Sequence, residues 1–282
     1  MRLFQVAAAG LLFITGVVGV ARADELADVK ARGKLVCGTL GTAEPFSFQD
    51  PKTREIVGYD IDICRKVADS LGVALEIKPM AVEARIPELL QGRVDILAAN
   101  LGWSKERAQQ IDYSYSYFVS EQKVLVSADS GIAALDQLSG KRVSALKGSS
   151  SEQGVRRVIP TAETVTFQDS SSAFLAVVQG KVDGFCASEL ILVKLRKQAQ
   201  ASAPMSIVEK SVFLEPWGLG VRKGEAAFKD QVNKVLADLD ASGEAGKIFA
   251  KWFGPGTVYD MKRDFKIEEA CTRLARTCAA LR

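Results

Sequence analysis

A guanidinium group follows a buried segment of this chain. Residues 94–100 read VDILAAN, an apolar run typical of a strand that is covered on both faces, and Arg107 lies shortly beyond its end. A guanidinium presents a planar set of donors that suits a carboxylate, and it stays charged at any biological pH. Two interpretations are compatible with this position: capture of an anionic ligand, or a surface ion pair with Glu106 or Asp112.

A second candidate anion site lies in LKGSSSEQGV, residues 146–155, where a glycine and three serines separate a predicted strand from a predicted helix. The free N–H groups and the positive dipole end at the start of a helix bind anions. The same serines also suit an ordinary N-cap, with Glu152 assisting. A cap needs only one hydroxyl, so both interpretations hold together, and the candidate contacts are Ser149, Ser150 and Ser151.

The chain contains no histidine. This excludes Ser-His-Asp and Cys-His nucleophiles, histidine general bases and histidine-ligated zinc. The chain also lacks the CxxC pairs of a structural zinc site. We therefore expect neither a metal nor a cofactor.

Residues 1–23 have the layout of a secretory signal peptide. Arg2 precedes an apolar stretch, and Ala21-Arg22-Ala23 forms a small-x-small cleavage site. A membrane anchor is the alternative, but Ala and Gly dilute the apolar run. Cleavage would start the mature chain at Asp24, place it in the periplasm, and lower the formal net charge from +3 to +1, since Arg2 and Arg22 are lost with no acid. We therefore expect no nucleic-acid partner.

Five cysteines in an oxidising compartment permit at most two intramolecular bridges. Cys37 and Cys64 are either bridged or small core residues. Cys271 and Cys278 are too far apart on a continuous helix to be bridged without a break. The pairing stays open.

An internal echo divides the chain into two halves. GKLVCGT at Gly33 returns as GKRVSAL at Gly140, and QGRVDILAANL at Gln91 returns as QGKVDGFCASEL at Gln179. Each pair reads as matching strand and helix pieces, which predicts two similar α/β lobes.

Two segments are predicted to connect these lobes. Residues 121–128 lead out of the first lobe and residues 217–224 return to it, which is the arrangement of a hinge. The predicted division is 24–126 plus 221–282 for lobe 1, with a C-terminal helical extension, and 127–220 for lobe 2.

Three long phrases carry a resemblance to a known family. PFSFQDPKTREIVGYDIDICRKVADSLG, RIPELLQGRVDILAANLGWSKERAQQIDYSYSYF and SGEAGKIFAKWFG resemble the polar-amino-acid family of bacterial extracellular solute-binding proteins, and lean toward its glutamate/aspartate branch. The resemblance implies the type II periplasmic-binding-protein fold, an α/β fold whose two lobes close on a ligand. It also implies a monomer that captures an amino acid or related small carboxylate and presents it to an ABC permease in the inner membrane.

The resemblance assigns roles to individual residues. Arg107 matches the family's ligand α-carboxylate site, and the three serines match the turn that caps the same carboxylate. Arg85 matches a residue that reaches the side-chain carboxylate of acidic ligands, although a surface cation is the alternative. Asn100 would offer backbone groups. Gly102 stands where the family commonly carries a Ser or Thr hydroxyl, so one polar contact is missing.

One departure concerns the ligand's α-amine. The family's carboxylate for this amine falls at Ser188-Glu189, and a buried ammonium without a partner costs several kcal/mol. Either Glu189 or Glu44 supplies the charge, or the ligand has no α-amine. The alternative function is a periplasmic dehydratase of the cyclohexadienyl or arogenate type on the same fold, with Glu44 or Glu189 as proton donor.

Overall fold

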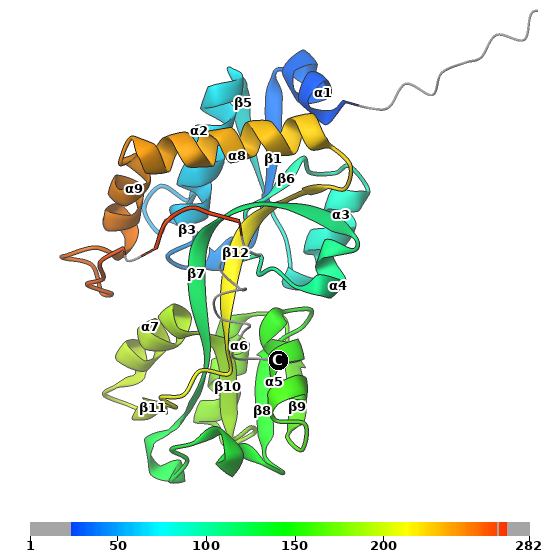
Figure 1. Cartoon of the computed structure of the whole chain (residues 1–282). Helices are drawn as coiled ribbons and strands as arrows, with labels where there is room; N and C mark the ends of the chain where they lie inside the picture. Colours follow the sequence, from blue (N-terminus) through cyan, green and yellow to red (C-terminus); the bar gives the residue numbers. More distant parts are fainter. Residues whose placement is uncertain (1–23, 264, 270–282) are drawn as a thin grey trace, which may run out of the picture.

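The computed structural model describes residues 24–263 and 265–269, and within them the chain forms two α/β lobes (Figure 1). The two-lobed α/β fold expected from the sequence is confirmed. Two long strands, β7 (Ile111–Ser127) and β12 (Phe213–Arg222), run through both lobes and join their sheets into one. How the chain divides between the lobes stays a prediction, because these strands belong to both.

Lobe 1, the upper lobe in Figure 1, contains strands β5, β1 and β6, with β1 parallel to both neighbours, and then β12 and β7. A small second sheet has the order β2-β3-β4. Apart from β7 and β12, the helices and strands of lobe 1 are α1 (Glu25–Arg32), β1 (Lys34–Thr39), β2 (Thr42–Ala43), β3 (Ser47–Gln49), β4 (Ile56–Val57), α2 (Tyr59–Leu71), β5 (Ala74–Pro79), the 3-10 helix η1 (Val82–Ala84), α3 (Arg85–Leu90), β6 (Ile96–Leu97), α4 (Lys105–Ala108), α8 (Ala226–Ala241) and α9 (Glu244–Phe253).

Lobe 2 repeats this plan. β8 is parallel to β9 on one side and to β10 on the other, and β10 then pairs antiparallel with β7 as β6 does with β12. The repeat explains the internal echo. Its elements are η2 (Ala128–Ser130), η3 (Leu135–Leu138), β8 (Arg142–Leu146), α5 (Ser150–Val158), β9 (Glu163–Phe167), α6 (Ser170–Val178), β10 (Gly184–Ser188), α7 (Glu189–Ala199) and β11 (Met205–Ile207), which pairs with β7.

The sheet of lobe 2 is buried on both faces. Val124 and Val126 of β7 belong to one hydrophobic cluster, and Leu125 between them belongs to another. Side chains alternate between the faces of a strand, so each face packs against its own helices. The consecutive apolar residues that identified these strands in the sequence follow from this burial.

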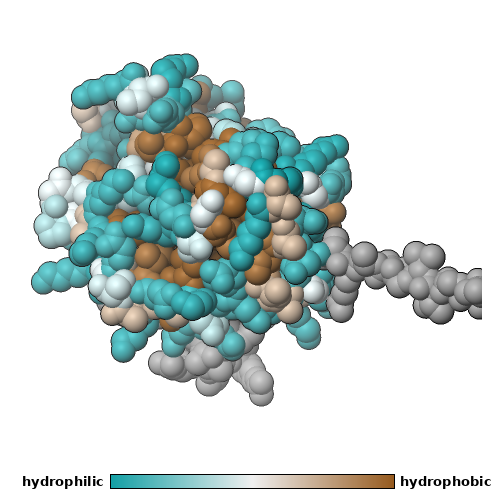
Figure 2. Space-filling view, turned by 90° about the horizontal axis from the view of Figure 1, so that it is seen from above, coloured by the Kyte–Doolittle hydropathy of each residue, from teal (hydrophilic) through white to brown (hydrophobic). Residues whose placement is uncertain are grey.

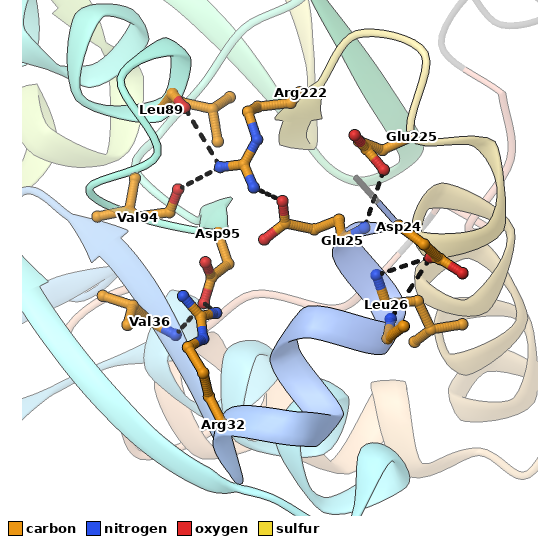
Figure 3. A network of polar contacts seen from close by, with 11 residues as sticks. Asp24, Glu25, Leu26, Arg32, Val36, Leu89, Val94, Asp95, Arg222 and Glu225 are labelled. Carbon is orange, nitrogen blue, oxygen red and sulfur yellow. Dashed lines mark hydrogen bonds and ion pairs between the residues drawn. The ribbon is translucent and has the colours of Figure 1, made fainter. Parts of the chain in front are cut away.

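A polar network holds the start of the described chain to the end of β12 (Figure 3). Glu25 of α1 forms a buried ion pair with Arg222, and its backbone N–H donates to Glu225 at 3.0 Å. Arg222 also donates to the carbonyl of Val94 at 3.2 Å. Because these bonds join α1, the segment before β6 and the last residue of β12, the returning strand is fixed to lobe 1.

A disulfide joins Cys37 of β1 to Cys64 of α2, so of the two roles considered for this pair the structure has the bridge. Cys186 is a free, buried thiol in β10. Burial raises the pKa of this thiol to about 12, so it stays protonated. Cys271 and Cys278 lie outside the described residues, as does the predicted signal peptide at 1–23.

The predicted C-terminal helical extension is wrong for the part of the tail that the structure describes. Residues 260–263 and 265–269 form no helix. Instead the backbone N–H of Ser116 in β7 donates to Glu268 at 2.7 Å, and Phe265 packs against Phe118. Phe265 and Ile267 alternate with polar residues, a period that suits an extended segment on the core better than a helix.

The surface of lobe 1 seen from its far end is mostly hydrophilic, with hydrophobic side chains visible in gaps between polar ones (Figure 2). Scattered apolar exposure of this kind is normal for a folded protein. None of the helices in the described residues is long and apolar enough to cross a membrane.

Candidate functional site

A cavity lies between the lobes, at the carboxyl ends of the parallel strands. Such strand ends are where α/β folds place their ligands. The cavity has a volume of about 60 Å³ when measured by where the centre of a water molecule can lie. Its polar lining residues come from both lobes and from the two long strands: Thr42, Arg85, Asn100, Gln122, Ser149, Ser150, Ser151, Gln168, Ser170, Ser188 and Glu215. Of the described lining residues, Arg85 is the one cation and Glu215 the one anion.

Arg85 is the first residue of α3, and its side chain is buried in the cavity wall rather than exposed on the surface. Its Nε donates to the carbonyl of Val82 at 2.8 Å, and Nη1 donates to those of Ala99 at 2.8 Å and Asn100 at 3.1 Å. Burial and the neighbouring charge of Arg107 lower the pKa of Arg85 to about 9, so the group remains a cation at neutral pH. These bonds hold the guanidinium in one place.

Arg107 belongs to α4, which Ser104 caps by accepting from the Arg107 backbone N–H at 3.3 Å. The side chain is buried, but it does not line the cavity. Its Nη1 donates to the carbonyl of Gly102 at 2.9 Å and its Nη2 to that of Gly148 at 3.0 Å. The guanidinium therefore lies behind the cavity wall and contacts both lobes.

The carbonyl of Gly148 is one point at which the lobes meet. It accepts from Arg107 and, at 3.5 Å, from Nη2 of Arg85, so two cations of lobe 1 converge on one oxygen of lobe 2. Gly148 has a φ of 72°, and an added Cβ would lie 2.9 Å from the Cα of Glu83 in lobe 1. A glycine is required by both the backbone conformation and this close approach. The structure is thus a closed arrangement of the lobes.

The three serines have separate functions in the structure. Ser149 caps α5 by accepting from the Glu152 N–H at 3.1 Å, as the N-cap interpretation predicts. The Ser151 hydroxyl donates to Oε1 of Gln122 at 2.6 Å. All three line the cavity. Their contact with a ligand stays a prediction.

Asn100 lies at the strand end with a φ of 50°, a left-handed conformation that is uncommon for a residue with a side chain. Its backbone N–H donates to Asp60 at 3.2 Å, and Asp60 also accepts from the Tyr117 hydroxyl at 2.7 Å. Burial raises the pKa of Asp60 to about 7, against these two hydrogen bonds and the charge of Arg85. The side-chain oxygen of Asn100 is buried and has no partner among the described residues.

The two acids considered for a ligand amine have lysine partners instead. Glu189 starts α7 and forms an ion pair with Lys123 at 2.8 Å, and Glu44 pairs with Lys194 of the other lobe. Neither lines the cavity. Ser188, which ends β10, does line it, and its hydroxyl accepts from Ser120 at 2.7 Å. Ser188 is the last residue of β10 and faces the cavity, whereas Glu189 is the first residue of α7 and its side chain lies at Lys123.

Glu215 is the site residue that sequence reasoning missed. It is 2% exposed, and one carboxylate oxygen, Oε2, accepts from Gln122 Nε2 and Trp217 Nε1, both at 2.7 Å. Burial raises the pKa of Glu215, while Arg107, the side chains of Ser150 and Trp217, and Arg85 act against this rise. The signal available in the sequence was an acid inside LEPWGLGV, an otherwise apolar strand.

Gly102 makes room for Glu215. Gly102 does not line the cavity, but a side chain added to it would overlap the Glu215 carboxyl group. A side chain at position 102 and the carboxylate of Glu215 would therefore compete for one place.

Comparison with known proteins agrees with this geometry. The family model of bacterial extracellular solute-binding proteins, family 3, matches residues 35–255. A glutamine-binding protein of an ABC transporter from Bacillus subtilis is 32% identical over 233 residues, covering 81% of this chain and 84% of that protein. An L-glutamate/L-aspartate-binding protein from Pseudomonas aeruginosa is 28% identical over 246 residues, covering 82% of each.

Solved structures show the same fold. The structure of an ancestral arginine-binding protein bound to arginine is 36% identical, with a TM-score of 0.74 and coverage of 79% of this chain and 99% of that one. An ancestral amino acid-binding protein described as a precursor of cyclohexadienyl dehydratase is 30% identical, with a TM-score of 0.75 and coverage of 81% and 99%.

Proposed function

Because this chain belongs to the bacterial extracellular solute-binding proteins, family 3, we propose that it is the amino acid-binding protein of an ABC importer. It captures its ligand outside the cytoplasmic membrane and delivers it, as a monomer, to a membrane permease. β7 and β12 act as the hinge about which the lobes open and close. The named relatives, which bind glutamine, or glutamate and aspartate, support this assignment.

The observation that carries the proposal is a cavity between two lobes with one cation and one anion in its wall, Arg85 and Glu215. An amino acid is a zwitterion, and burying each of its charges is favourable only beside an opposite charge. The lobe contact at Gly148 supports a closed state that encloses the ligand.

Size and charge narrow the ligand class to a compact, acidic amino acid. The cavity volume corresponds to roughly four to six water molecules, which favours aspartate over a long side chain such as arginine. Arg85, Arg107 and Glu215 together carry one excess positive charge, which a ligand with one net negative charge balances. Arg85 would meet the ligand's side-chain carboxylate and the serine turn its α-carboxylate, with Arg107 supporting both from behind the wall.

A dehydratase is the second candidate, because one structural neighbour is described as a precursor of such an enzyme. That neighbour is itself described as a binding protein. The two acids expected to serve as proton donors, Glu44 and Glu189, pair with lysines outside the cavity. Glu215 is the acid that an enzyme would have to use instead.

A thermal-shift screen of the twenty amino acids, succinate and glutarate tests the proposal. Saturation at about 100 times the dissociation constant adds about 2.7 kcal/mol of stability. This corresponds to a rise of roughly 5–10 °C in Tm for a protein of this size. L-aspartate or L-glutamate should give the largest rise. An unchanged Tm with every amino acid, or conversion of prephenate or arogenate to product, would contradict the assignment.

A further inference from the structure

The cavity needs an acceptor for a ligand ammonium group, and one atom in its wall meets the requirement. Oε1 of Glu215 is buried and has no hydrogen-bond partner among the described residues. A buried carboxylate oxygen without a donor is costly, so its place in a cavity wall points to a donor that arrives with the ligand.

The carboxylate is held ready for such a donor. Gln122 and Trp217 both donate to Oε2, which fixes the plane of the carboxyl group, and the nearby Ser150 side chain further favours the ionised carboxylate. Gln122 is in turn held by the Ser151 hydroxyl of the serine turn. The orientation of Glu215 therefore depends on the serine turn of lobe 2, which lies against the proposed ligand.

The charge of Glu215 is also supported. Burial raises the pKa of Glu215, but the guanidinium groups of Arg107 and Arg85 favour its ionised form against that rise. An ionised carboxylate is the acceptor that an ammonium group binds most strongly.

Gly102 supplies an independent observation. Its missing side chain opens the space into which the Glu215 carboxyl projects. Position 102 carries no side chain and Glu189 pairs with Lys123, so the carboxylate of Glu215 on β12 is the one anion among the described residues of the cavity wall.

We propose that Oε1 of Glu215 accepts a hydrogen bond from the ligand's α-ammonium group and sets the preference for amino acids over the corresponding acids without an amine. The inference rests on the proposed function. It assigns the recognition of the amine to the hinge strand β12 rather than to the end of β10.

The experiment measures Kd by calorimetry for L-aspartate and succinate, with L-glutamate and glutarate as a second pair. Wild type should bind the amino acid of each pair roughly 100-fold more tightly, about 2.7 kcal/mol. Glu215→Gln should lose most of this preference by weakening the amino acid roughly 30-fold or more while succinate changes little. Glu121→Gln, on the neighbouring hinge strand and outside the cavity, is the matched control and should keep the wild-type preference.

Three results would overturn the inference: an unchanged preference in Glu215→Gln, equal weakening of both members of a pair, or loss of the preference in Glu189→Gln instead. Binding of no amino acid by wild type would instead refute the proposed function, so the two failures are distinguishable.

A double substitution keeps the test informative if Glu215→Gln folds poorly. Gly102→Ser alone should impair amino acid binding, because the Cβ of the new side chain would overlap the Glu215 carboxyl group. In the Glu215→Ala background, the same substitution should restore part of the lost affinity, since the serine hydroxyl then has space to accept from the amine. Additive losses of affinity in the double variant would contradict the inference that the two side chains compete for one position.

Discussion

The two lobes share one strand plan and use it for different chemistry. In lobe 1, the segments after β5 and β6 carry Arg85 and Arg107, two buried cations. In lobe 2, the cavity-lining residues in the segments after β8 and β9 are serines and Gln168, which are all neutral. The repeat therefore places functional candidates of both lobes at the carboxyl ends of parallel strands, but it does not determine their chemistry. Among the described residues of the cavity wall, the one carboxylate is that of Glu215, which lies on β12, a strand that both lobes share.

The largest expected effect concerns the buried cations of lobe 1. Arg107→Ala removes a buried cation that donates to both lobes, and truncating one partner of a buried charged contact costs about 2–5 kcal/mol. Binding of the best ligand should weaken roughly 100-fold or more, measured by calorimetry. Arg93→Ala, an exposed arginine of the same lobe paired with Glu88, should bind as wild type does. Equal affinities in the two variants would refute a functional role for Arg107.

The second effect concerns covalent support, which lobe 1 has and lobe 2 lacks within the described residues. The bridge between Cys37 and Cys64 spans 27 positions, and a loop of that length contributes about 3 kcal/mol. The Cys37→Ala/Cys64→Ala variant should melt roughly 6–12 °C lower by scanning calorimetry. A reductant should lower the Tm of wild type but not of the variant. An unchanged Tm in the variant would show that the bridge adds no stability.

A smaller effect concerns Gly148, a neutral residue of lobe 2. Gly148→Ala places a Cβ against Glu83 of the other lobe in addition to the left-handed strain of about 1–2 kcal/mol. Gly140→Ala is the matched control, because its φ is 70° and nothing lies within 4 Å of its added Cβ. Both variants should lose stability, but only Gly148→Ala should lose affinity, roughly 10-fold by calorimetry. Equal affinities would contradict a lobe contact at Gly148.

The last effect is a pH dependence within lobe 1. The pKa of Asp60 is about 7 in the folded protein against an ordinary 3.8, so the folded state holds a proton that the unfolded state releases. Stability from this group therefore falls as pH rises from about 4 to about 7. Asp60→Asn cannot titrate, so its Tm should fall less than that of wild type over this range. Parallel Tm profiles would contradict the buried titration.

Periodicity and the internal echo predicted the two lobes because buried strands and capped helices leave regular patterns. Local sequence could not show the C-terminal tail as extended, since its course depends on packing against β7 and on residues such as Phe118. The apolar pattern of residues 228–254 would suit one long helix, but α8 and α9 are separated at Gly243, which has a φ of 75°. The pattern of apolar residues continues across that break and so hid it.

The cavity wall was predictable where a residue's position depends on a strand end. Arg85, Asn100, Ser188 and the three serines follow predicted strands or begin predicted helices, and all line the cavity. Glu215 was not predictable in this way, because its role depends on Gly102, 113 positions away in the chain. The space beside Gly102 and the Glu215 side chain that fills it come from distant segments, so neither local sequence indicates the contact.

A crystal structure with bound L-aspartate, or with whichever amino acid the screen selects, tests the central claim most directly. We predict closed lobes, ligand carboxylate oxygens in contact with the Arg85 guanidinium and the serine turn, and the ligand nitrogen about 2.7–3.2 Å from Oε1 of Glu215. A ligand located outside this cavity, or one whose amine contacts Glu189 or Glu44 while Oε1 stays without a donor, would contradict the account.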